Sequence, residues 1–123
     1  MVKVFTREVY GQVIRFSIEN VGKDYNIIIS GGTRAHIGSV SIATPVQNLE
    51  TGHDSATVST FVYLGHKDDH IGHKVAYDMC KILRANVVVC CGVHYDALSK
   101  DEIEHVMDMT TQLMQEALTR LNE

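Results

Sequence analysis

The sequence predicts a single α+β domain spanning residues 1–123, in which a mostly antiparallel sheet of about six strands packs two helices on one face. Strand-like segments fill the first half of the chain, and both helical patterns come late. The resulting order, β-β-β-β-β-α-β-α, is typical of α+β proteins. Hydrophobic residues make up 45% of the chain, which is enough for one sizeable core.

The first three strands are expected within the opening thirty residues. Residues 2–8 have the character of a short strand. Clean alternation of apolar and polar residues over 11–21 predicts a half-buried strand, and the β-branched run 25–30 predicts another. The turn Gly22-Lys23-Asp24 between the last two is short, so we expect them to form an antiparallel hairpin.

The next two strands are expected around a long hairpin tip. A strand is predicted over residues 37–44, and the only proline, Pro45, follows it. The polar segment from Pro45 to Ser55 is interpreted as a long, mobile tip. A returning strand is expected over 56–64, and no role is assigned to residues 46–55.

The last strand is apolar on both faces. It comprises Val87 to Cys91 and follows a helix expected from about Asp69 to Ala85. Such a strand belongs in the middle of a sheet, with cover on both sides. Since both helices are expected on one face, we predict that a homodimer covers the other face by stacking sheet on sheet.

A second helix begins at a capping box. Ser99 has the position of the cap, and Glu102 has the position that reaches back to it. Behind them, apolar residues recur at helical spacing, which predicts one buried helix face. The members of that face are Ile103, Val106, Met107, Thr110, Leu113, Met114, Ala117, Leu118 and Leu121.

Composition and charge exclude several classes of protein. The formal net charge is −4 and no basic run occurs, which argues against nucleic-acid binding. No apolar stretch approaches the roughly 20 residues that a membrane span needs, and the first residues lack a signal-peptide core. The three cysteines, two of them adjacent, do not form a disulfide framework. We therefore expect a soluble, cytoplasmic protein.

Three glycine- and histidine-bearing corners lie at or near strand ends, at residues 31–38, 64–74 and 90–96. We expect them to meet in one pocket. Glycines permit close backbone approach to a phosphate, and free N–H groups at a helix N-terminus favour anions. Neither of the standard nucleotide-binding glycine loops is present.

The middle corner has alternative interpretations that the sequence leaves open. His66, His70 and His73 are ordinary zinc ligands, so a small metal-dependent enzyme is one alternative. Their spacing matches no standard metal pattern, and a solvated helix start explains the same residues. No nucleophile-elbow sequence G-x-S-x-G occurs. A pure protein-interaction subunit is the third alternative.

Four short runs resemble a known family. They are Ile29-Ser30-Gly31-Gly32, His36-Ile37-Gly38-Ser39-Val40, Gly65-His66-Lys67-Asp68 and Gly92-Val93-His94-Tyr95-Asp96. Together, over roughly residues 25–105, they resemble the LpdD-like chaperone proteins, the small D subunits of gallate decarboxylase associated with UbiD-type, prenylated-flavin-dependent decarboxylases. The resemblance also implies a fold akin to small proteasome-assembly chaperones.

The resemblance implies a non-catalytic accessory protein that helps deliver or mature prenylated FMN for a UbiD-type decarboxylase. It implies no catalytic residue and no bound metal. Joined with the anion argument, it predicts that prenylated FMN or FMN binds where the corners converge. The expected ligand-binding residues are Arg34, His36, Gly38, His66, Lys67, Asp68, His94 and Asp96.

Overall fold

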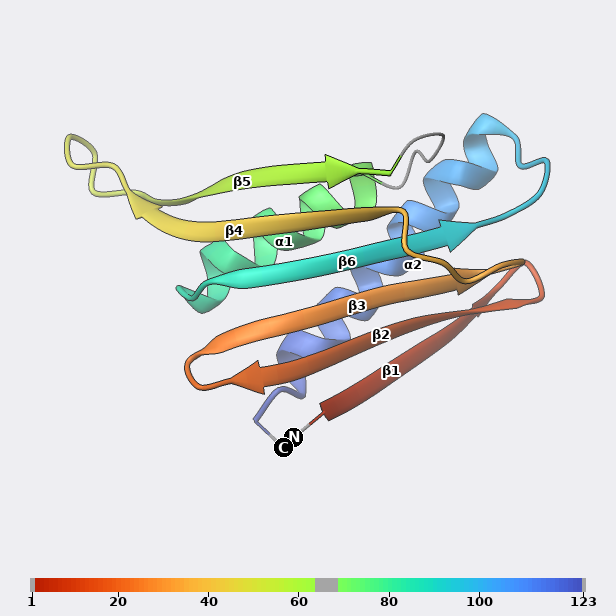
Figure 1. Ribbon diagram of the computed structural model, residues 1–123, viewed down its shortest axis with the longest axis horizontal. Coiled ribbons are helices and arrows are strands. Elements are labelled where there is room, and N and C mark those ends of the chain that lie inside the picture. The colour runs from red at the N-terminus through yellow and green to blue at the C-terminus, as the bar shows by residue number, and fades with distance from the viewer. Residues whose placement is uncertain (1, 64–68, 123) are drawn as a thin grey trace.

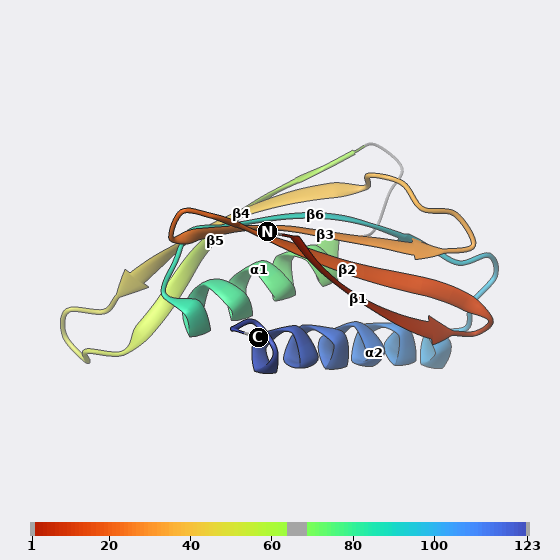
Figure 2. The same ribbon diagram turned by 90° about the horizontal axis from the view of Figure 1, so that it is seen from below.

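The computed structural model describes residues 2–63 and 69–122, which form a six-stranded sheet with two helices on one of its faces (Figures 1 and 2). This confirms the predicted α+β architecture. In chain order the elements are β1 (Val2–Val9), β2 (Gln12–Val21), β3 (Asp24–Gly32), β4 (Ser39–Gln47), β5 (Asp54–Val62), α1 (Asp69–Leu83), β6 (Val87–His94) and α2 (Lys100–Thr119).

The strands lie side by side in the order β1-β2-β3-β6-β4-β5. All neighbouring strands are antiparallel except β3 and β6, which run parallel. The predicted hairpin of β2 and β3 is confirmed, and so is the interior position of β6. Because β6 separates β3 from β4, the chain between those two strands has to cross over β6.

The core lies between the sheet and the helices. α1 packs against β4, β5 and β6, whereas α2 packs against β1 and β2 (Figure 2). Side chains that alternate along the strands point into this layer and are fully buried, as are residues on both helices. The largest of them are Phe16, Ile14, Ile18, Ile27, Ile29, Met79 and Leu113.

The predicted limits of the second hairpin are wrong. β4 continues through Pro45 to Gln47, and β5 begins at Asp54, so the tip comprises only residues 48–53. Pro45 is tolerated because β4 pairs with β6 only as far as Ala43. Beyond that point one side of β4 needs no ladder donor, which is the position where a strand accepts proline.

Smaller differences follow from pairing and capping. β6 extends to His94, three residues beyond the predicted end, because its last residues pair in register with the end of β3. α1 ends at Leu83, two residues before the predicted limit.

The capping box of α2 is confirmed, since Glu102 N–H donates to Ser99 Oγ and Ser99 N–H donates to Glu102 Oε1. Ile103, expected in the buried face, is half exposed.

Candidate functional site

The connection from β3 to β4 crosses over the C-terminal end of β6. Its first residue, Thr33, donates its N–H to the carbonyl of His94 at 2.6 Å. Its last residue, Gly38, donates to the carbonyl of Cys91 at 2.9 Å. The crossing segment, residues 33–38, is therefore held at both ends by β6. Two of the three predicted corners thus meet, although they are more than fifty residues apart in the sequence.

Gly92 makes this crossing possible. A Cβ atom at that position would collide with the backbone carbonyl of His36, so no other residue type fits without movement of the main chain. A glycine inside a strand often marks such a close backbone approach. The apolar run Val87–Cys91 that precedes Gly92 makes this signal readable in the sequence.

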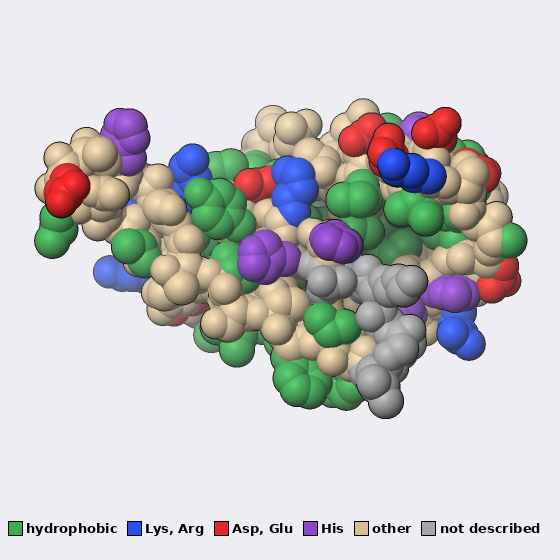
Figure 3. Space-filling model, turned by 90° about the horizontal axis from the view of Figure 1, so that it is seen from above, with side chains coloured by type: hydrophobic (Ala, Val, Ile, Leu, Met, Phe, Trp, Pro, Cys, Tyr) green, Lys and Arg blue, Asp and Glu red, His purple; other side chains and the backbone are tan. Residues whose placement is uncertain are grey.

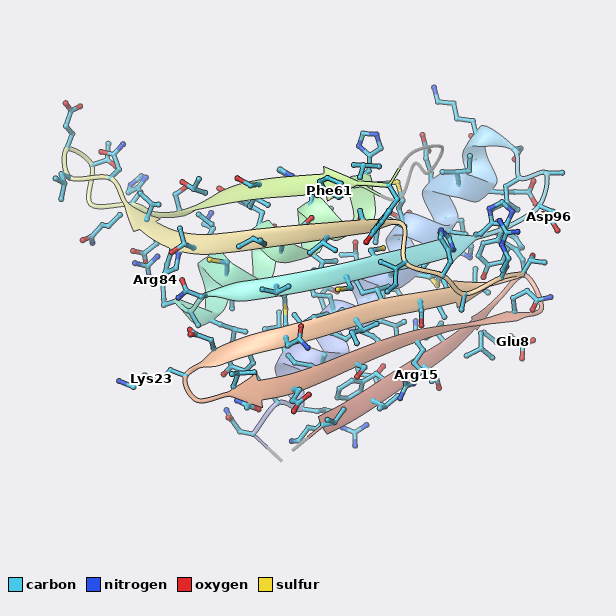
Figure 4. The ribbon with its side chains drawn as sticks, viewed as in Figure 1. Glu8, Arg15, Lys23, Phe61, Arg84 and Asp96 are labelled. Atoms are coloured by element: carbon cyan, nitrogen blue, oxygen red, sulfur yellow. The ribbon has the colours of Figure 1, made fainter. Side chains whose placement is uncertain are left out.

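The side chains of the two corners form a small polar group. The rings of His36 and His94 lie edge to face with centroids 6.3 Å apart. His94 Nε2 lies 3.0 Å from a carboxylate oxygen of Asp96, and His36 Nδ1 lies 3.3 Å from the carbonyl of Arg34. Asp96 is at the end of the sheet beside β6 in Figure 4. The Arg34 side chain is exposed, which leaves the group with one cation, one carboxylate and two imidazoles.

An aromatic group lies beside this corner, and of its members the sequence predicts only Tyr95 at this place. The Tyr95 hydroxyl donates to the carbonyl of Val9 at 2.7 Å. The ring of Tyr10 lies edge to face with Tyr95 and 5.4 Å from the ring of His105. Burial raises the pKa of Tyr95. The group therefore ties the β1–β2 turn and α2 to the end of β6.

The third predicted corner falls largely outside the described residues, and this includes His66, Lys67 and Asp68. Two described residues near this stretch lie against the end of the first corner and the start of β4. Tyr63 donates its N–H to the carbonyl of Gly38 at 2.8 Å. On α1, a Cβ atom at Gly72 would lie 3.1 Å from Ser39 Oγ. Tyr63, the last described residue before the stretch 64–68, thus lies beside Gly38, and Gly72 lies beside Ser39.

His70 and His73, the other members of the proposed metal cluster, are both exposed on α1. Histidine side chains gather in the middle of the β5 side of the molecule in Figure 3. His73 Nδ1 lies 3.0 Å from the hydroxyl of Thr60, which in turn bonds to the buried Ser41 at 2.8 Å. Within residues 2–63 and 69–122, no group of three or more His, Cys, Asp or Glu side chains is arranged to hold a metal ion.

The structure therefore brings together five of the eight predicted ligand-binding residues at the β6 end of the sheet. These five are Arg34, His36, Gly38, His94 and Asp96. The backbone of Gly38 joins this corner to its neighbours, because its N–H donates to Cys91 and its carbonyl accepts from Tyr63. The remaining three lie in the part of the chain that is not described.

The three cysteines differ in burial, and none of them forms a disulfide among the described residues. Cys91 is fully buried, whereas Cys90 points to the opposite side of the sheet and is partly exposed, as strand alternation predicts. All three cysteines are free thiols.

Neither of the described helices has the length and apolar character that crossing a membrane requires.

The fold is shared with an assembly chaperone. Over 98% of both chains, the structure superposes with a TM-score of 0.58 on a chain of the "Novel Chaperone Complex for Yeast 20S Proteasome Assembly". The sequence identity is 10%, so this likeness concerns the fold alone. It confirms the expected relation to small proteasome-assembly chaperones at the level of architecture.

The family is shown by the sequence comparison. Residues 8–122 match the prenylated flavin chaperone LpdD-like domain, and the chain belongs to that family. It is also 27% identical to Protein LpdD of Lactiplantibacillus plantarum over 117 residues, which cover 95% of this chain and 83% of that protein. Family membership indicates an accessory, chaperone-like role.

Proposed function

We propose that this protein is a non-catalytic accessory subunit that binds prenylated FMN, or FMN, and delivers or matures it for a UbiD-type decarboxylase. The observation that carries the proposal is the crossing of residues 33–38 over β6, which places His36 and Arg34 beside His94. Family membership supplies the class of ligand. The protein acts in the cytoplasm, as a homodimer and without a metal ion.

The donors at the corner fit the phosphate end of a flavin. Arg34 offers an exposed guanidinium, and guanidinium binds phosphate through paired hydrogen bonds. His36 and His94 add ring N–H donors and flat surfaces. Asp96 is the exception, because its carboxylate repels a phosphate. We assign Asp96 the role of orienting His94, whose Nε2 it contacts at 3.0 Å.

The undescribed residues His66 and Lys67 belong to the same proposal. Before this stretch Tyr63 bonds to Gly38, and after it Gly72, in the first turns of α1, lies against Ser39. In this proposal Lys67 adds a second positive charge for the phosphate. Asp68 completes the proposed set of ligand-binding residues. Bound flavin would supply the chemistry of the partner decarboxylase, and this chain would hold and shield it.

The test is a titration of the purified protein with FMN and with prenylated FMN, followed by absorbance, fluorescence and native mass spectrometry. We expect saturable binding of one flavin per chain. Arg34→Ala/His94→Ala should weaken it at least tenfold, and His66→Ala/Lys67→Ala should abolish it with thermal stability nearly unchanged. Asp96→Asn keeps an amide oxygen for the contact with His94 and removes the repelling charge, so it should tighten binding of the phosphate.

His53→Ala provides the matched control, since His53 is an exposed histidine in the hairpin tip at the opposite end of β4. It should bind flavin as the parent protein does. Unchanged affinity in both double variants would overturn the assigned site. Binding of neither flavin, with metal in the native mass, would instead support the metal-dependent enzyme. Binding of neither ligand would leave a pure protein-interaction subunit.

A further inference from the structure

One whole face of the sheet carries no helix. Both helices pack on the opposite face (Figure 2). On the open face several large apolar side chains are exposed, including Ile28 at 40%, Ile42 at 59% and Phe61 at 65%. Exposed apolar side chains gathered on one face are typical of an interaction surface.

The strand register arranges the centre of this face into one straight row. Each member is the direct cross-strand partner of the next, from β1 to β5. The row consists of Val4, Ser17, Ile28, Cys90, Val40 and Phe61. It contains no charged residue and crosses all six strands, so we name it the central row.

Two opposite charges flank the central row symmetrically. On β2, Arg15 lies two residues to one side of Ser17, and Glu19 lies two residues to the other side. Both are exposed, and Arg15 is on the open face shown in Figure 4. At about 3.4 Å per residue, each stands about 7 Å from the row.

We infer that a second copy of this chain stacks on the open face, with its two-fold axis lying along the central row. This deepens the homodimer of the proposed function by naming its surface and its register. Rotation about that axis lays β2 of one protomer over β2 of its partner in the opposite direction. Arg15 then faces the partner's Glu19, and Glu19 faces the partner's Arg15, while the central row packs on itself.

Two charged residues near the ends of the strands, Glu8 and Lys23, are also consistent with a two-fold rotation about the central row. Glu8 is at one end of β1, and Lys23 lies in the turn at the opposite end of the sheet (Figure 4). The same rotation brings the Glu8 end of one protomer over the Lys23 end of the other. A two-fold axis that runs along β2 itself would instead place Arg15 over the partner's Arg15 and Glu19 over the partner's Glu19, which is unfavourable.

The size of the face also suits a stable dimer. Six strands spaced about 4.8 Å apart, each with about eight residues of 3.3 Å, make a face of at most about 800 Å², part of which the crossing segment covers at the end of β6. A standard specific interface buries about 800 Å² on each partner. Two sheets that stack with aligned strands form a core about 10 Å thick, which is the architecture of a β-sandwich.

The test uses charge reversal on β2, read by sedimentation and native mass spectrometry. Arg15→Glu alone places two glutamates opposite each other at both contacts, and Glu19→Arg does the same with arginines. Each single variant should dimerise at least tenfold more weakly than the parent. The double variant, Arg15→Glu/Glu19→Arg, restores both pairings and should recover dimer affinity.

The sharpest result comes from mixing the two single variants. A heterodimer of Arg15→Glu with Glu19→Arg pairs opposite charges at both contacts, so it should exceed either homodimer in the mixture. The masses of the variants differ, and native mass spectrometry resolves the three species. Glu104→Arg, an exposed reversal on α2, is the matched control and should leave dimerisation unchanged. Circular dichroism confirms that each variant is folded.

Cys90 supplies a second readout, because it lies in the central row. In the parent, its reaction with a maleimide should slow at least tenfold as the protein concentration rises into the dimer range. In Arg15→Glu it should stay fast. A monomer at all concentrations, or a dimer indifferent to both reversals, would overturn the inference. Flavin titration of the single variants separates this outcome from a failure of the flavin site, since the β6 corner lies outside the row.

Discussion

The two faces of the sheet differ in what covers them, although they share the same strands. On β3 three consecutive isoleucines make the contrast plain. Ile27 and Ile29 point toward the helices and are fully buried, whereas Ile28 points to the open face and is 40% exposed. Neighbouring side chains of the same type therefore have different roles, one in the core beneath the helices and one on the exposed surface. The covered face provides the stability of the monomer, and the open face is available for association.

The largest expected effect comes from this isoleucine pair. Ile29→Ala removes a fully buried side chain and should lower the free energy of unfolding by about 2–5 kcal/mol. Ile28→Ala should cost clearly less than Ile29→Ala, because the Ile28 side chain is already 40% exposed in the folded chain. Urea denaturation at low protein concentration, where association does not contribute, measures both. Equal losses would contradict the division of the faces.

The next effect tests the crossing segment, which covers part of the open face. Gly92→Ala sets a Cβ atom against the carbonyl of His36, so either the strand or the crossing has to shift. We expect a loss of about 1–3 kcal/mol and weaker flavin binding. Cys90→Ala, two residues away on the same face, is the matched control for urea denaturation and should change the stability by less than half as much.

A smaller effect is expected where a helix supports the covered face. Ser99→Ala removes the cap of α2 and should cost about 1 kcal/mol, measured by urea denaturation. Ser55→Ala, a half-buried serine at the start of β5, serves as the comparison and should cost less. An unchanged midpoint for Ser99→Ala would show that packing of α2 against β1 and β2 makes its cap unnecessary.

The smallest effect is a pH dependence at the same cap. Hydrogen bonds from Ser99 hold the pKa of Glu102 below its ordinary value of 4.5. The folded state therefore binds this proton less readily than the unfolded state, so the contribution is present above about pH 4.5 and lost as the pH falls through the lowered pKa. Glu102→Gln keeps a capping side chain but does not titrate. Its stability should fall less between pH 7 and pH 3.5 than that of the parent, as urea denaturation at each pH can show.

Much of the fold was predictable because it is written in local patterns. Alternation on β2, the doubly apolar β6 and the capping box at Ser99 each depend on residues close together in the chain. The errors lay where a neighbour from elsewhere decides the outcome. Pro45 reads locally as the end of a strand, yet pairing with β5 carries β4 past it. β6 likewise extends because β3 lies beside it.

Of the candidate site, the sequence identified the residue types but not their arrangement. Histidines beside glycines at strand ends were visible from the start, and Gly92 inside an apolar strand was itself a sign of close approach. The pairing of Tyr10 with Tyr95 and His105 had no such sign, because the three residues belong to a turn, a strand end and a helix.

From its own periodicities, then, this chain specifies its elements, their order and a central strand in need of two covers. Three things depend on the folded molecule: the crossing of residues 33–38 over β6, the meeting of Arg34 and His36 with His94, and the face left open. The first two join segments more than fifty residues apart. The third depends on which face of the sheet the helices cover. Local patterns carry no information on either, since strand order and helix placement come from packing across the whole sheet.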